Sequence, residues 1–139
     1  MTHWAADYIG NPWDAAENHC WAFCRRVWRE HFGVEVPEVL VDGASPRAGM
    51  RAFGQGQPGW TQVAVANEGD GVLMARGDRV CHVGIWIAAG TGGVLHAIES
   101  TGTVFTPVAR LASLGYRVTG FYRRVSDVRQ ADAGSPQGG

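Results

Sequence analysis

The sequence has no long apolar run and no excess of one charge, and only three of its 139 residues are cysteine. No segment approaches the roughly 20 apolar residues of a membrane-spanning helix. The first residues, "MTHWAADYIGNPW", have neither the basic start nor the apolar core of a signal peptide. We therefore expect a soluble protein without a membrane partner, made in the cytoplasm.

The charge balance disfavours nucleic-acid binding, and the composition of a glycine-rich segment disfavours phosphate binding. The 12 Lys and Arg are balanced by 13 Asp and Glu, and no long basic stripe is present, whereas nucleic-acid binding depends on neutralising phosphates. The stretch "GQGQPG" lacks the Lys and Ser/Thr of a phosphate-binding loop. We expect no nucleic-acid partner and assign this stretch no phosphate-binding role.

The three cysteines are expected to be thiols. They cannot all pair within the chain, and their spacing matches no disulfide framework of secreted proteins. A chain of this length buries enough apolar surface for one core without cross-links. We predict one domain over residues 1–125 and a disordered tail over residues 126–139, whose composition offers little to bury.

The first half of the chain has a helical pattern. Apolar residues recur at helical spacing and predict a helix over about 19–32. Asn18 is the expected cap of its first turn, and Gly33 stands where a helix commonly ends in a left-handed residue. Short helices are also predicted over 2–9 and over 46–53.

From residue 70 the pattern changes to short strands separated by Gly, Asp and Thr turns. The predicted strands cover residues 71–76, 81–88, 93–99, 104–108 and 116–124. Helices followed by an antiparallel sheet make an α+β fold.

Cys20, at the start of the predicted helix, is the first candidate for chemistry. The positive end of a helix dipole lowers the pKa of a thiol, and the thiolate is the reactive form. His82 could act as the base and His96 could orient it, and a hairpin centred near residue 89 would place the two histidines opposite each other. Strict alternation puts Cys81 on the other face from His82, so we interpret Cys81 as a core residue.

Less specific interpretations of the same residues stay open at this point. A cysteine on an apolar helix face is commonly a buried wall residue, and a histidine in a strand is commonly a satisfied polar residue. Cys20 and Cys24 lie one helical turn apart and, together with His82 and His96, offer ligand types suited to structural zinc. The pattern alone does not decide between packing, metal binding and nucleophilic catalysis.

Three ordered motifs resemble those of a known family. They are "NHCWAFCRRVWREHFGVEVP", "GDGVLMARGDRVCHVGIWI" and "VLHA", and with the closing "GYRVTGFYRR" they span most of the chain. They resemble the nucleophile helix, the base strand and the third-residue strand of the NlpC-type cell-wall cysteine peptidases, which are papain-like enzymes. The chain looks most like the compact members that are encoded among bacteriophage tail genes.

The resemblance implies a fold, an activity and roles for residues. The fold would have N-terminal helices packed on a five- or six-stranded antiparallel sheet. The activity would be hydrolysis of an amide bond in peptidoglycan stem peptides, typically between D-γ-glutamyl and diaminopimelate or Lys, with no metal or organic cofactor. By position, Cys20 is then the nucleophile, His82 the general base and His96 the orienting residue.

Two positions depart from the family pattern. The family has Asp just before the nucleophile, where it helps to hold the amino end of the stem peptide, and this chain has His19. The family's Tyr near the oxyanion site is replaced by Trp13, whose indole N–H is still a donor. We expect Trp13 and His19 to line the oxyanion site or the substrate groove.

The resemblance also implies partners and a place of action. The expected partners are peptidoglycan stem peptides and other phage tail proteins, and the expected route is delivery in a phage tail particle to the cell wall or periplasm. The alternatives are a non-catalytic tail-assembly or adaptor protein of the same fold, an amidase toxin directed at the wall of competing bacteria, and the zinc-binding domain.

Overall fold

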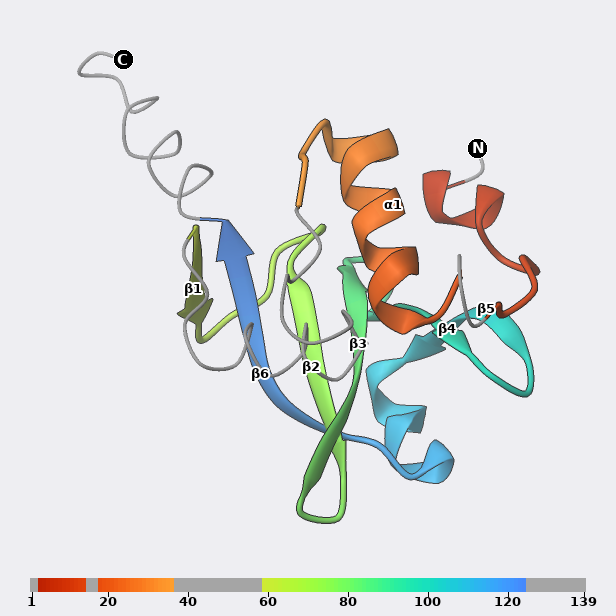
Figure 1. Ribbon diagram of the computed structural model, residues 1–139. Helices are drawn as coiled ribbons and strands as arrows, with labels where there is room; N and C mark the ends of the chain where they lie inside the picture. Colours follow the sequence, from red (N-terminus) through yellow and green to blue (C-terminus); the bar gives the residue numbers. More distant parts are fainter. Residues whose placement is uncertain (1–2, 15–17, 37–58, 125–139) are drawn as a thin grey trace, which may run out of the picture.

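The computed structural model describes residues 3–14, 18–36 and 59–124, and their arrangement is α+β, as predicted (Figure 1). The elements, with η for a 3-10 helix, are η1 (Trp4–Asp7), α1 (Cys20–Phe32), β1 (Trp60–Val63), β2 (Gly71–Arg76), β3 (Arg79–Ile87), β4 (Gly93–Ile98), β5 (Gly102–Pro107), η2 (Val108–Leu114) and β6 (Arg117–Arg124). The predicted helix over 46–53 and the predicted tail over 126–139 lie outside the described residues.

The helix α1 begins one residue later than predicted because its cap is His19 rather than Asn18. Nδ1 of His19 accepts a hydrogen bond from the Ala22 N–H at 3.2 Å. Asn18 instead donates from Nδ2 to the carbonyl of Pro12 at 2.7 Å and so holds the segment that enters the helix. Gly33 ends the helix in the left-handed conformation, with φ of 69°, as expected.

The sheet has six antiparallel strands in the order β1-β6-β2-β3-β4-β5. Five of the strands match the predicted ranges closely. The four-residue strand β1 and the helix η2 are not predicted. None of the β1 residues is buried, so the strand has no apolar alternation to detect.

The helix α1 packs across β3 and β4 on one face of the sheet (Figure 1). Successive strand residues point to opposite faces, so apolar side chains form two cores. The helix-side core includes Cys20, Phe23, Cys24, Val27, Trp28, Leu73, Val83, Ile85, Ile87 and Leu95. The second core, on the other face, consists of Val72, Met74, Val94, Leu111 and Tyr116. Within the described ranges, no helix is both long and apolar enough to span a bilayer.

Candidate active site

The strands β3 and β4 pair over only a short stretch, from Ile85 with Leu95 to Ile87 with Gly93. Before Ile85, β3 continues alongside β2, and after Leu95, β4 continues alongside β5. The two strands therefore separate next to His82 and His96. This register centres the hairpin at residue 90, one residue after the position that would place the two histidines opposite each other, so they are not directly opposite.

His82 and His96 nevertheless meet diagonally through their ring nitrogens. Nε2 of His82 lies 2.8 Å from Nδ1 of His96, and Nε2 of His96 lies 2.9 Å from Oγ1 of Thr106 in β5. All three side chains are buried. The series His82, His96 and Thr106 joins three neighbouring strands, and Thr106 is a member that sequence reasoning misses.

Gly84 makes room for this contact. A Cβ on Gly84 would clash with Cγ1 of Val94 and lie 3.0 Å from Cβ of His96. Because a side chain at this position would displace the strand that carries His96, the glycine in "HVGIW" is a structural requirement of the histidine pair.

Burial keeps both imidazoles neutral. It lowers the pKa of His82 to about 3, with further lowering by the charges of His96 and Arg76, and it lowers the pKa of His96 to about 4. A neutral imidazole has one N–H and one acceptor nitrogen. If His96 donates from Nε2 to Thr106, its Nδ1 must accept from Nε2 of His82. Nδ1 of His82 then has a lone pair and can accept a proton.

Cys20 is the first residue of α1, and its thiol lies against β3. The backbone N–H of Val83 donates to Sγ of Cys20 at the point where β4 no longer pairs with β3. Since Val83 directly follows His82, the thiol lies against the strand segment that carries the base. Burial raises the pKa of Cys20 to about 11 despite the backbone hydrogen bonds. The N–H groups at the start of α1 do lower this pKa, but burial outweighs them, so the thiol is not the low-pKa thiol that the sequence predicts.

Cys81 does not lie where strict alternation predicts. Met74 pairs with His82 and Ala75 pairs with Val80, so Cys81 is the extra residue of a β-bulge. It is half-buried and packs against the second core, the core that contains Tyr116. The predicted position on the face opposite His82 is wrong because the bulge interrupts the alternation.

Trp13 and His19 lie close to the helix start. Trp13 is half-buried and packs against the helix-side core, to which Cys20 belongs. His19 directs Nδ1 into the first turn of α1 as its cap. The structure accounts for both residues by packing and capping, and their expected roles toward a substrate stay predictions.

The zinc alternative has no support in this arrangement. Among residues 3–14, 18–36 and 59–124, no three His, Cys, Asp or Glu side chains come together as metal ligands would. Cys24 is fully buried in the helix-side core. The facing nitrogens of His82 and His96 are engaged in their mutual hydrogen bond.

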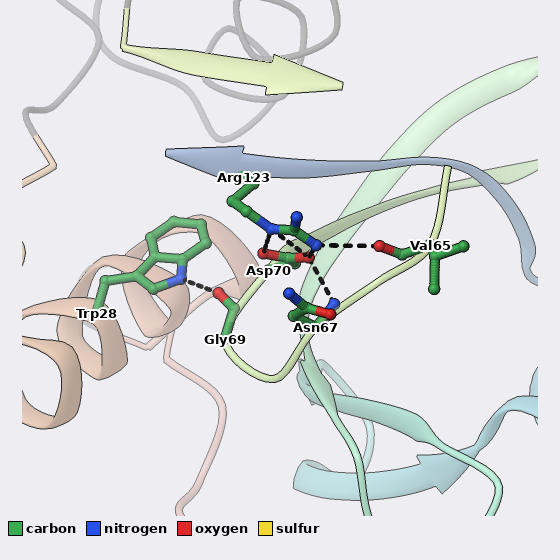
Figure 2. Close-up of polar contacts among 6 residues, drawn as sticks. All are labelled: Trp28, Val65, Asn67, Gly69, Asp70 and Arg123. Atoms are coloured by element: carbon green, nitrogen blue, oxygen red, sulfur yellow. Dashed lines mark hydrogen bonds and ion pairs between the residues drawn. The ribbon is translucent and has the colours of Figure 1, made fainter. Parts of the chain in front are cut away.

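A second polar cluster lies where α1 meets the sheet (Figure 2). The guanidinium of Arg123 binds both carboxylate oxygens of Asp70, at 2.7–3.2 Å, and also donates to the carbonyl of Val65 at 3.0 Å. Asp70 accepts from the Asn67 N–H at 2.7 Å. Beside it, Nε1 of Trp28 in α1 donates to the carbonyl of Gly69 at 2.8 Å. The cluster connects α1, β6 and the segment that leads into β2.

Comparison of the chain with known protein families and with curated proteins gives no match. A functional assignment therefore rests on the residues of the site and on the motifs that contain them.

Proposed function

We propose that this protein is a papain-like cysteine peptidase of the NlpC type that hydrolyses an amide bond in the peptide stems of peptidoglycan. The observation that carries the proposal is the buried series from His82 through His96 to Thr106, together with Cys20, which opens α1 and accepts a hydrogen bond from the N–H of Val83, the residue after His82. A base with a defined tautomer next to a thiol is the arrangement that nucleophilic catalysis needs. The motif resemblance supports the substrate class and the bond between D-γ-glutamyl and diaminopimelate or Lys.

The first step is attack of the Cys20 sulfur on the scissile carbonyl. Because the thiol is protonated at neutral pH, its proton moves from Sγ to Nδ1 of His82 as the S–C bond forms. The His82 imidazolium then donates this proton to the leaving amine as the C–N bond breaks. The products of this step are the free amine and an acyl-enzyme on Cys20.

The second step returns the enzyme to its starting state. A water molecule gives a proton to Nδ1 of His82, and its oxygen forms a C–O bond with the acyl carbon. The C–S bond breaks, and the sulfur takes the proton back from His82. Through both steps His96 accepts from Nε2 of His82 and so keeps the base in one orientation.

The start of α1 supports the negative charge that develops on the carbonyl oxygen. The backbone N–H groups of a first helical turn have no carbonyl partner within the helix, and the dipole at this end is positive. The N–H groups of Cys20 and Trp21 both point toward the sulfur, and we assign the N–H of Cys20 to the oxyanion site. The indole of Trp13 is the candidate for a second donor.

The biological setting that we propose is a bacteriophage tail. The enzyme would open the wall locally, and stem peptides and other tail proteins would be its partners. This part of the proposal follows from the motif resemblance.

The test is a digest of purified muropeptides, analysed by mass spectrometry. Wild-type protein should produce new fragments whose masses identify the bond, and Cys20→Ala should reduce turnover by at least about 1,000-fold, because the nucleophile is removed. Cys24→Ala is the matched control, since it removes a thiol one turn further along the same helix face. We expect it to keep most of the activity.

Three outcomes contradict the proposal or redirect it. Full activity in Cys20→Ala would exclude the thiol mechanism. Absence of fragments with the wild-type protein would favour the non-catalytic tail-assembly role. Release of the whole stem from the sugar would indicate an amidase, as in the toxin alternative.

A further inference from the structure

Tyr116 contacts both histidines but lies outside the strands that carry them. Its ring stacks on the imidazole of His82, with centroids 4.6 Å apart and planes 14° apart. The same ring meets His96 edge-on, with centroids 5.9 Å apart and planes at 71°. Tyr116 is itself buried. Its ring therefore forms an aromatic wall along the histidine pair.

Two features hold Tyr116 in this place. Gly115, at the end of η2, has a φ of 87°, a left-handed conformation that favours glycine, and the following Tyr116 N–H bonds to the carbonyl of Leu111 at 3.1 Å. The guanidinium carbon of Arg76 lies 4.4 Å from the centroid of the Tyr116 ring. Arg76 is held in turn by a hydrogen bond of 3.2 Å to the carbonyl of Leu114.

A base that is held by one hydrogen bond can still turn. Because Nε2 of His82 lies close to the axis of the Cβ–Cγ bond, the contact with His96 restrains rotation of the imidazole about this bond only weakly. A parallel ring at stacking distance blocks that rotation. The restraint matters because a misplacement of about 1 Å in a reacting group can reduce the rate about 100-fold.

We propose that Tyr116, braced by Arg76, is a positioning residue that fixes the plane of the His82 imidazole for proton exchange with Cys20. This inference rests on the proposed peptidase function. Tyr116 itself transfers no proton and touches no substrate in this scheme.

The charge of Arg76 gives the arrangement a second effect. Among the described residues, the charged and titratable groups that act on or contact His82 are Arg76 from β2, His96 from β4 and Tyr116, and the thiols of Cys20 and Cys81 lie within electrostatic reach of Tyr116. Arg76 is the permanent cation among them, and with burial and His96 it lowers the pKa of His82. Removal of this charge should raise the pKa of His82 and move the acid limb of the rate profile to higher pH.

The kinetic test compares four variants on the muropeptide substrate. Tyr116→Leu should lower kcat by about 10- to 100-fold at unchanged KM, because the imidazole is free to turn. Tyr116→Phe keeps the ring and should rescue most of kcat. Arg76→Gln should move the acid limb of the pH profile upward. Arg79→Gln, across the same hairpin, is the matched control and should leave the profile as in the wild type.

A second measurement does not depend on activity. Long-range ¹H–¹⁵N spectra of the imidazoles report which nitrogen of His82 carries the proton. The wild type and Tyr116→Phe should show one tautomer, protonated at Nε2, and Tyr116→Leu should show a mixture of two. Circular dichroism checks that each variant is folded. If Tyr116→Leu is unfolded, the positioning role is judged from the other variants, which are Tyr116→Phe, Arg76→Gln and Arg79→Gln.

The outcomes separate this inference from the function on which it rests. Wild-type kcat and a single His82 tautomer in Tyr116→Leu would overturn the positioning role. The same would follow if Tyr116→Phe were as impaired as the Leu variant, or if Arg76→Gln behaved as Arg79→Gln does. If the wild-type protein shows no activity, the proposed peptidase function fails. The spectra alone would then decide whether Tyr116 orients His82.

Discussion

The direction of the hydrogen bond between Thr106 and His96 is coupled to which nitrogen of His82 is protonated. If Oγ1 of Thr106 accepts from His96, the proton of His82 lies on Nε2, and Nδ1 is a base. If Oγ1 donated instead, His96 would donate from Nδ1 and the proton of His82 would move to Nδ1. His82 would then be unable to take a proton from Cys20. The direction of the hydrogen bond at the end of the series is thus tied to the tautomer at its beginning.

We predict that Thr106→Val lowers kcat by about tenfold and the free energy of unfolding by about 1–3 kcal/mol, because it leaves the buried Nε2 of His96 without its hydrogen-bond partner. Thr106→Ser keeps the hydroxyl and should restore most of both. Steady-state kinetics and urea denaturation measure the two effects. Equal loss in the Val and Ser variants would show that the methyl group, and not the hydroxyl, is what the site needs.

Residue types explain what the sequence predicts of this site and what it does not. Cys20, His82 and His96 are candidates because thiol and imidazole carry recognisable chemistry. Thr106 and Tyr116 are common in strands and turns, and their importance depends on cross-strand placement. Placement requires the register, which the glycines near the β3–β4 turn leave ambiguous.

At the scale of elements, the cluster around Asp70 determines how α1, β6 and β2 fit together. The Asp70 side chain is only 6% exposed, and the Arg123 side chain is 21% exposed. A carboxylate this deeply buried needs its guanidinium partner, because an unpaired buried charge is costly. Asp70 directly precedes β2, at the point where pairing with β3 and β6 begins.

We predict that Arg123→Met lowers the free energy of unfolding by about 3 kcal/mol, because the Asp70 carboxylate remains buried without its cation. The cost should be smaller in an Asp70→Asn background, where no charge is left unpaired. Urea denaturation of the two single variants and the double variant measures this coupling. Arg79→Met, which removes an exposed arginine, is the control. Strictly additive single effects would contradict the role of the ion pair.

The outcome for each element follows from the strength of its local signal. α1 has an apolar stripe and a terminal glycine, and its predicted range is nearly that of the structure. The strand β1 is not predicted because it is short and lacks buried residues. The bulge at Cys81 is not predicted because it arises from the pairing of two strands, which the alternation within one strand does not reveal.

At the scale of the whole molecule, buried histidines link stability to pH. The pKa of His82 is lowered to about 3 and that of His96 to about 4, from an ordinary value of 6.5, mainly by burial. Between the folded pKa values and the ordinary value of 6.5, the unfolded chain binds more protons than the folded protein. Stability therefore rises with pH in this window and is lost as the pH falls below 6.5. Each histidine changes the free energy of unfolding by up to about 1.4 kcal/mol per pH unit in this window.

We predict that the free energy of unfolding falls steeply as the pH is lowered from 6.5 toward the pKa values of the folded histidines. His96→Asn should make this fall less steep, because one proton fewer is taken up on unfolding. Urea denaturation at several pH values measures the slope. His3→Gln, which removes a partly exposed histidine, controls for the loss of a histidine as such. An unchanged slope in His96→Asn would show that His96 is not buried in its neutral form.

The strand order has a consequence for synthesis. Among the strands of residues 59–124, β6 is made last, yet it lies between β1 and β2 in the finished sheet. A growing chain that already contains Cys20, His82, His96 and Thr106 still lacks the strand that closes the sheet, and its contacts are distant in sequence and form late. The proposed hydrolase would thus acquire its activity only after β6 has been made and has joined the sheet.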